Sequence, residues 1–495
     1  MYDLVDSIYR TFYIQKLVHF LAMQHMQQTT GSSLERSALI VATLTSFLGP
    51  FTISSVNVAL PAIQSDLQMN AVQLSWIATA YLLAVAIGLV PAGKIADIHG
   101  RKKVFATGLA VYTAGSFMAV FTTSAPLFIT LRIVQGLGAA MFVTTGMAIL
   151  TSIFPANRRG RVIGIYVAAV YIGLSVGPLA GGFFTQHFGW RSIFVILLPL
   201  GILSLLLTLS KLRGEWRGEP GQHLDLVGCL LYASTILALV YGATLVPSPA
   251  GLSLSACGIV LLYIFVKHQL RVRFPVFDVK LFAQNKTFAF SSLAALLHYS
   301  ATFAVTFLMS LYLQYIKEMS PQTAGSVLMA QPIMMAILSP LAGRIADRLE
   351  PRLLATAGMI VTVVSVAMFI GLSPATSLYA IIANLILLGT GFAFFSSPNM
   401  SAIMGAVEKR HYGLASGTVA TMRLLGQMLS MAVATVVLAV LIGREAITPD
   451  NYNLFLQSVH TVFTISALFC LSGVYFSWFR GAVLHQPWEN GDNGR

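Results

Sequence analysis

The stretch GKIADIHGRKKV, Gly93–Val104, places four cationic side chains and an aspartate in a short loop between two long apolar runs. Only 9% of the 495 residues are charged, and 56% are hydrophobic. Soluble domains are typically about 45–50% apolar and about 25% charged, so this composition indicates an integral membrane protein. The charged loop is therefore a place where the chain leaves the hydrocarbon.

Apolar runs long enough to cross a membrane recur along the chain. A transmembrane helix needs about 20 apolar residues, whereas a barrel strand needs about 10. The runs have helical length, and the predicted fold class is an all-α membrane protein with 14 transmembrane helices. Their approximate bounds are 37–63, 74–95, 104–122, 126–150, 161–185, 190–210, 224–246, 251–267, 288–315, 321–346, 353–372, 377–404, 412–442 and 454–479.

Lysine and arginine are concentrated in one set of alternating loops and in the two termini. The exceptions are Arg132, Arg191, Lys317, Arg423 and Arg444. Positive loops remain in the cytoplasm, so we expect a multi-pass protein of the plasma (inner) membrane with both termini cytoplasmic. The net charge of +13 then reflects topology, and no nucleic-acid partner is expected.

The charged loop has a degenerate second copy, GRIADRLEPRLL, at Gly343–Leu354. Two further segments repeat with a common offset: 131–142 with 384–395, and 159–173 with 412–426. Parallel repeats of this kind build transporters from two bundles that move around a central site. We therefore predict two six-helix bundles related by a pseudo-twofold repeat, plus two extra central helices.

This organisation divides the chain into five parts. They are a cytoplasmic N-terminal extension (1–36), an N-terminal six-helix bundle (37–210), two linking transmembrane helices with cytoplasmic loops (211–287), a C-terminal six-helix bundle (288–479) and a cytoplasmic tail (480–495).

Four motifs in register resemble the major facilitator superfamily and, within it, the 14-span drug:proton antiporter group of the multidrug efflux type. They are GKIADIHGRKKV, LRIVQGLGAA (131–140), GLSVGPLAGGFF (173–184), and VNVALPAI (56–63) with WIATAYLL (76–83). The resemblance covers roughly residues 36–480. It implies a monomeric secondary transporter that exports amphipathic small molecules by alternating access and proton antiport, without cofactor or metal.

The resemblance assigns gating to the two charged loops, through Gly93, Asp97, Gly100, Arg101 and Asp347. Asp97 is expected to pair with an arginine and a helix end of the opposite bundle. The candidate partners are Arg158, Arg159 and Arg161. The alternative is simple loop structure, in which the cations fix topology and Gly100 permits a tight turn.

The antiporter motif comprises Gly173, Gly177, Pro178, Gly181 and Gly182. Glycines four residues apart let helices approach closely, and proline removes a backbone hydrogen bond and bends the helix. These residues therefore predict packing and a kink, and the resemblance takes the bend as the mark of export.

Arg132, Arg423 and His298 are the coupling candidates. A charge inside a span is costly and is a functional hypothesis by default, and the resemblance implies proton coupling or anion binding for the arginines. The alternative for Arg132 is pairing with a backbone carbonyl. His298 and also His460 titrate in a useful range, but a lone membrane histidine is more often a hydrogen-bonded core residue.

One feature departs from the group, which usually carries an acidic residue in the first span. The stretch SFLGPFTISSVNVALP (46–61) contains neither Asp nor Glu, and we place no acidic residue deep in any span. A buried carboxylate is the usual proton carrier because burial raises its pKa. Recognition of cationic drugs is then less favoured, and coupling must use another group, with Asp97 and Asp225 near cytoplasmic ends.

Neutral polar and aromatic side chains are expected to line the substrate cavity. The candidates are Asn57, Trp76, Tyr81, Gln135, Tyr171, Tyr299, Gln331 and Asn399. Trp76 could equally anchor at the membrane interface. The alternative function is transport of a specific metabolite, such as an organic anion drawn to Arg132 and Arg423, with different or no ion coupling. The sequence holds neither HExxH nor GxxxxGK[ST], which disfavours an enzyme and a nucleotide-driven pump.

Overall fold

The computed structural model describes residues 2–481, except 219–220, 246–247, 278, 347, 408–411 and 444. Side chains are described from Leu34 onward, with further exceptions at 156–157, 159–160, 412–414 and 416. The helices of the first half are α1 (Tyr2–Leu67), α2 (Ala71–His99), α3 (Arg101–Val120), α4 (Ala125–Ile153), α5 (Ala156–Phe188) and α6 (Ser192–Lys211). A hairpin follows, α7 (Leu226–Thr244) and α8 (Pro249–Arg271).

The second half begins after the short helix α9 (Val279–Gln284). Its helices are α10 (Lys286–Leu311), extended by a π-helical turn (Tyr312–Ile316), α11 (Pro321–Leu328), α12 (Ala330–Ala346), α13 (Pro351–Ile370), α14 (Leu378–Gly405), α15 (Tyr412–Leu441) and α16 (Tyr452–Phe479), the last preceded by a 3-10 turn (Pro449–Asn451).

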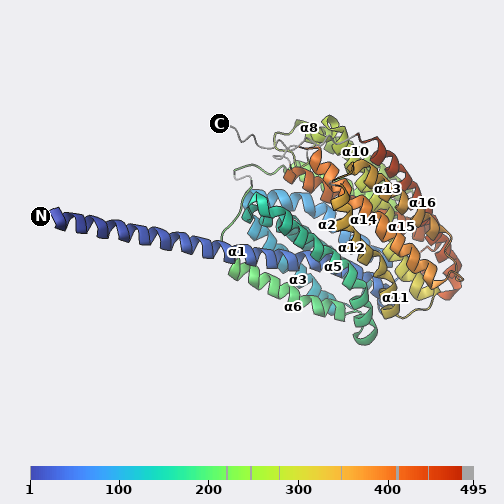
Figure 1. Cartoon of the computed structure of the whole chain (residues 1–495). Coiled ribbons are helices and arrows are strands. Elements are labelled where there is room, and N and C mark those ends of the chain that lie inside the picture. The colour runs from blue at the N-terminus through green and yellow to red at the C-terminus, as the bar shows by residue number, and fades with distance from the viewer. Residues whose placement is uncertain are drawn as a thin grey trace.

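The described residues contain 14 segments long and apolar enough to cross a membrane, which confirms the predicted number. Two details differ from expectation. Helix α1 begins at Tyr2 and enters the first span without a break, so the backbone of the predicted extension is helical (Figure 1). The tenth span consists of two helices, α11 and α12, which meet at Met329.

The two halves repeat the same helix pairings (Figure 1). In the first half α1 packs on α5, α2 on α4, and α3 on α4 and α6. In the second half α10 packs on α15, α12 on α14, and α13 on α14 and α16. The contacts between halves have the same symmetry, because α5 meets α11 while α2 meets α15, and α1 meets α10. This is the arrangement expected for two bundles related by a pseudo-twofold repeat.

The α7–α8 hairpin lies beside the seam between the halves, since α7 packs against both α2 and α15. The hydroxyl of Tyr232 donates to the backbone oxygen of Ala86, at 3.1 Å. The ring of Trp76 meets Tyr241 edge-on, with centroids 5.8 Å apart. Trp76 therefore packs on the hairpin, whereas we predicted it as a cavity-lining or interface residue.

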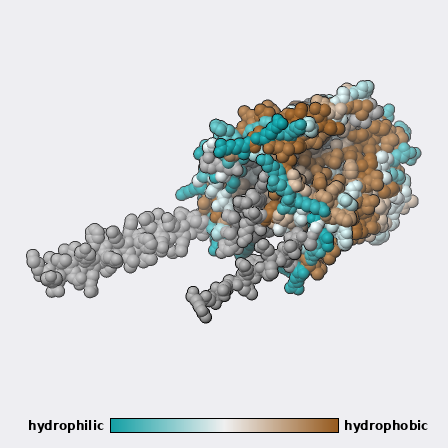
Figure 2. Space-filling view, turned by 90° about the horizontal axis from the view of Figure 1, so that it is seen from above, coloured by the Kyte–Doolittle hydropathy of each residue, from teal (hydrophilic) through white to brown (hydrophobic). Residues whose placement is uncertain are grey.

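Large apolar side chains remain exposed on the flank of the bundle, among them Leu230, Ile259 and Tyr263. Figure 2 shows this hydrophobic flank, with hydrophilic residues gathered toward the ends. Such an exposed apolar surface is stable only against lipid. We call the end with the α2–α3, α4–α5, α6–α7, α12–α13 and α14–α15 connections the basic end, and the other the opposite end.

A small polar cluster closes the hairpin at the basic end. Asp225 caps α7 by accepting from the amide of Gly228 at 2.8 Å, and also accepts from His268 Nε2 and Gln269 Nε2, both at 2.9 Å. The oxygen of Gln269 in turn accepts from the amides of Val276 and Phe277. Burial alone would raise the pKa of Asp225, but these hydrogen bonds, led by the one from His268, hold that pKa below its ordinary value.

We expect Asp225→Asn to destabilise the protein at neutral pH. Because the pKa is depressed in the folded state, the carboxylate contributes stability above its unfolded pKa, about 3.9, and loses it as pH falls through the folded pKa. The variant should melt about 2 °C lower at pH 7, and the difference should shrink below about pH 4. Thermal unfolding in detergent across pH 3.5–7.5 measures this, and an equal difference at every pH would contradict it.

Candidate functional site

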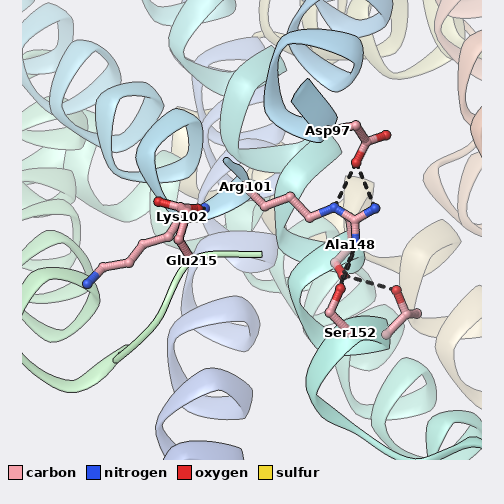
Figure 3. A network of polar contacts seen from close by, with 7 residues as sticks. Asp97, Arg101, Lys102, Ala148, Ser152 and Glu215 are labelled. Carbon is pink, nitrogen blue, oxygen red and sulfur yellow. Dashed lines mark hydrogen bonds and ion pairs between the residues drawn. The ribbon is translucent and has the colours of Figure 1, made fainter. Parts of the chain in front are cut away.

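The charged loop ties three helices together at the basic end (Figure 3). The guanidinium of Arg101 at the start of α3 pairs with Asp97 near the end of α2, with an N–O distance of 2.7 Å. Its Nη1 donates to the backbone oxygen of Ala148 at 3.0 Å and to the hydroxyl of Ser152 at 2.5 Å, both on α4. One side chain thus joins the ends of α2, α3 and α4.

In this structure Asp97 does not pair with a described arginine of the α4–α5 region. Asp97 pairs with Arg101, one turn further along the same loop, because the guanidinium also finds acceptors on α4 that fix its position. Of the residues we considered, Arg158 pairs instead with Glu35 at 3.2 Å. The side chain of Arg159 and all of Asp347 lie outside the described residues. The gating role of this loop stays a prediction.

The two glycines of the loop occupy crowded positions. A Cβ on Gly93 would lie 2.8 Å from Thr144 Cγ2 of α4. Gly100 has a φ of +128° and a Cβ there would collide with the carboxyl group of Glu215. Glycine is therefore required at position 100 by backbone conformation and by space.

Arg132 is buried within the first half and surrounded by neutral groups. Its Nε donates to the backbone oxygen of Ile77 at 3.2 Å, and its Nη1 to Gln135 Oε1 at 2.8 Å. The guanidinium carbon lies 4.4 Å from the ring centroid of Tyr81, and Gln135 Nε2 donates to the hydroxyl of Ser116. The pairing with a backbone carbonyl that we kept as an alternative is therefore present, within a larger polar cluster.

A second group lies between the halves. Arg423 of α15 is half-buried and within electrostatic reach of Tyr166 and Tyr171 of α5. Tyr171 is also close to Tyr299 of α10. These side chains come from both halves, so a solute bound between the halves would meet an arginine and tyrosines from two directions.

The remaining cavity candidates have other surroundings. Tyr81 and Gln135 belong to the Arg132 cluster. Asn57 is buried where α1 meets α10. The backbone oxygen of Gln331 lies so close to Gly389 of α14 that a Cβ there would collide with it. Of the eight candidates, Tyr171 and Tyr299 come from different halves and are within electrostatic reach of each other.

The two histidines differ in their environment. His298 is fully buried, its ring stacks on Phe395 with centroids 4.1 Å apart, and neither ring nitrogen has a hydrogen-bond partner among the described residues. It is enclosed within the second half in this conformation. His460 Nε2 is 2.6 Å from the backbone oxygen of Leu372, the hydrogen-bonded core histidine that we gave as the alternative.

The glycines of the antiporter motif bring α5 into close contact with neighbouring helices along its length. Gly173, Gly177 and Gly181 face α1, and a Cβ on Gly181 would lie 2.6 Å from the Cα of Ser55. Serines of α1 use this proximity: the hydroxyl of Ser55 donates to the backbone oxygen of Gly177 at 2.9 Å. The predicted close packing is confirmed, and its partner is the first helix of the same half.

Two members of the motif, Pro178 and Gly182, instead contact α11 of the other half. A Cβ on Gly182 would collide with the backbone oxygen of Pro321, and one on Gly325 with that of Pro178. Helices α5 and α11 therefore meet backbone to backbone at the opposite end. Nearby, His187 Nε2 lies 3.2 Å from Gln322 Oε1.

Further hydrogen bonds between the halves gather at the same end. The hydroxyl of Ser310 donates to the backbone oxygen of Asn57 at 2.7 Å, and Gln314 Nε2 to that of Val58 at 2.9 Å. The amide of Ala71 donates to the backbone oxygen of Glu445 at 2.8 Å. The halves are thus sealed together at the opposite end of the bundle.

Sequence reasoning missed Arg480, which lies at the end of α16 and is fully buried. Its Nη1 donates to Asn399 Oδ1 at 2.7 Å and to the hydroxyl of Ser291 at 3.3 Å, while Nε and Nη2 have no hydrogen-bond partner among the described residues. Burial lowers the pKa of Arg480 to about 10, although nearby Glu350 opposes this. Asn399, a predicted cavity residue, holds this arginine instead. Its position just after a span, at the start of the predicted cytoplasmic tail, gave no signal of burial.

Comparison with known proteins decides the family. The model of the Major Facilitator Superfamily matches residues 42–267 and 291–495. The chain belongs to this superfamily. The solved structure of a bacterial homologue of the human lysosomal transporter Spinster, described as inward-facing and unoccupied, has a TM-score of 0.67 at 15% identity and covers 90% of this chain and 97% of its own. This likeness shows the fold.

Two relatives within the superfamily differ in their named function. The riboflavin transporter RibZ of Clostridioides difficile is 31% identical over 447 residues, covering 89% of this chain and 96% of the relative. The multidrug resistance protein Stp of Mycobacterium tuberculosis is 32% identical over 393 residues, which cover 78% of this chain and 72% of the relative. The chain is therefore a secondary transporter of small molecules, not an enzyme, and is similar to both kinds.

The seal at the opposite end predicts a strong effect of a small substitution. We expect Gly182→Ala to lower the transport rate about tenfold, because the added methyl group meets the backbone of Pro321 and keeps the halves apart. Gly164→Ala on the same helix is the matched control, since a Cβ there has nothing within 4 Å. Equal rates for the two variants in proteoliposomes would contradict the assignment of this contact.

Proposed function

We propose that this superfamily member exports amphipathic small molecules from the cytoplasm across the plasma membrane, in exchange for protons, by alternating access. The observation that carries the proposal is the α5–α11 contact, in which Gly182 and Gly325 each approach the backbone of the other half. At these two glycines the helices meet through backbone rather than through interlocked side chains, so the contact is suited to opening and closing repeatedly.

Orientation follows from charge. The basic end carries most of the lysines and arginines and is proposed to face the cytoplasm, together with both termini. The structure then corresponds to a state sealed toward the outside. Relatives named as multidrug resistance and drug efflux proteins support export. The protein is proposed to act as a monomer in the lipid bilayer.

Proton coupling is proposed to act at the charged loop. Movement of this loop would break the ion pair between Asp97 and Arg101, and with it the tie from Arg101 to Ala148 and Ser152 of α4. Arg132 is held by neutral groups, so its guanidinium places a positive charge inside the first half. His298 remains a candidate for proton coupling only in a conformation in which α10 and α14 separate and expose its ring.

A second candidate is transport of a specific anionic metabolite. Arg423 is within electrostatic reach of Tyr166 and Tyr171 of the other half, so an aromatic anion between the halves would find both a cation and aromatic rings nearby. The relative named as a riboflavin transporter shows that metabolite transport occurs among similar chains.

The test is transport by the purified protein in proteoliposomes with an imposed pH gradient. Ethidium and a neutral amphiphile serve as parallel probes, and we expect gradient-dependent movement of at least one, abolished by a protonophore. Asp97→Asn should slow it about tenfold or more. Movement of neither probe by folded protein would refute the multidrug proposal. A screen of aromatic anions, with Arg423→Gln as the diagnostic variant, would then test the second candidate.

A further inference from the structure

Helix α3 begins without a cap of its own. Its first residue follows Gly100, which has no side chain, and the first amides of a helix need acceptors from elsewhere. These come from the segment after α6. The amide of Arg101 donates to the backbone oxygen of Trp216 at 2.9 Å, and the amide of Lys102 to Glu215 Oε1 at 2.7 Å.

This segment, residues 212–218, which we call the strap, is fixed at several points. Leu212 is buried in the core of the first half and its backbone oxygen accepts from Lys102 Nζ. Trp216 packs against the same core. Gly218 lies over the ion pair, since a Cβ there would be 2.8 Å from both Asp97 Oδ1 and Arg101 Nη2. The strap therefore contacts the charged loop at Arg101, Lys102 and Asp97. Figure 3 shows Glu215 of the strap beside Lys102.

Glu215 holds the central position in the strap. Its carboxylate accepts from the second amide of α3, where a negative charge is also favoured by the helix dipole. It occupies the space beside Gly100 that any Cβ would need. The turn at Gly100 sets the direction of the Arg101 side chain, and Arg101 joins α2 to α4.

We propose that Glu215 is a positioning residue of the transport cycle. By capping α3 it fixes the turn from which Arg101 binds Asp97 and Ser152, so that the basic ends of α2, α3 and α4 move as one unit. The inference deepens the proposed alternating-access function and rests on it. It adds a linking segment, outside both six-helix bundles, to the machinery of the gate.

The first experiment is amide hydrogen exchange on the full chain in nanodiscs. Glu215→Ala should raise exchange about fivefold to tenfold in the first turn of α3, the factor for loss of one N-cap, and also raise it at residues 148–153 of α4. Glu215→Gln, which keeps an accepting oxygen, should restore most of the protection. Arg217→Ala, an exposed residue of the same strap, is the matched control and should leave exchange unchanged.

If Glu215→Ala leaves the exchange rate of the first turn of α3 unchanged, or raises exchange in α3 but not in α4, the positioning role is overturned. This measurement needs no transported solute, so it is independent of whether ethidium is a substrate.

The second experiment is a double-mutant cycle on ethidium transport. Glu215→Ala should lower the maximal transport rate about tenfold, with little change in the half-saturating concentration. In an Asp97→Asn background the same substitution should lower the maximal rate by a further factor of less than about two. Independent, multiplicative effects would overturn the claim that Glu215 acts through the Asp97–Arg101 pair. If the wild type does not move ethidium, the cycle is run on the neutral amphiphile; failure to move either probe would refute the multidrug proposal and would leave the exchange data to decide the role of Glu215.

Discussion

The structure depends on how closely helix α5 approaches its neighbours. Along one side, glycines at four-residue spacing let α5 lie against α1, where serine hydroxyls bond to its backbone. Near its end, Pro178 and Gly182 meet α11 of the other half in the same backbone-to-backbone manner. In the membrane, packing of this kind takes the place of the hydrophobic driving force. The contact with α1 is made within one half, while that with α11 joins the two halves that separate in the proposed transport cycle.

Each half also contains a buried arginine held by neutral partners. Arg132 uses Gln135 and a backbone oxygen, and Arg480 uses Asn399 and Ser291. Burying an ion costs several kcal/mol even after relaxation, so these sites are retained against a cost in stability. Because Gln135 and a backbone oxygen take the place of a carboxylate at Arg132, the interior of the first half stays positive. This fits transport of neutral or anionic solutes better than binding of a cation by an embedded carboxylate.

The spans, the repeat and the glycine motif were predictable because they depend on local composition and fixed spacing. The partners of the charged loop were not. Glu215 lies far along the chain from Lys102, in a linker without any motif, and only the folded path of the chain places it over α3. Asp97 was expected to reach a distant arginine, yet Arg101 was one helical turn away. Contacts between residues one turn apart on a helix can be predicted from a sequence, whereas the place where an irregular segment packs cannot.

Exposure of single polar residues was equally hard to predict. Arg480 follows the last span among residues expected to be cytoplasmic, but packing of α10 and α14 around the end of α16 buries it. Trp76 was predicted to line the cavity or to anchor at the membrane interface, and the hairpin supplies Tyr241 as its partner. Depth in the membrane can be read from hydropathy, but the direction of a side chain depends on neighbours from other helices.

The central claim is that the contact between α5 and α11 opens during each transport cycle. The most direct measurement cross-links His187→Cys to Gln322→Cys, whose side chains meet in the structure, after replacing Cys229, Cys257 and Cys470 by alanine. The control pair, Asp66→Cys with Arg191→Cys, lies within one half. We predict that the first cross-link stops transport until it is reduced, while the control cross-link does not. Unchanged transport by fully cross-linked 187–322 protein would contradict the account.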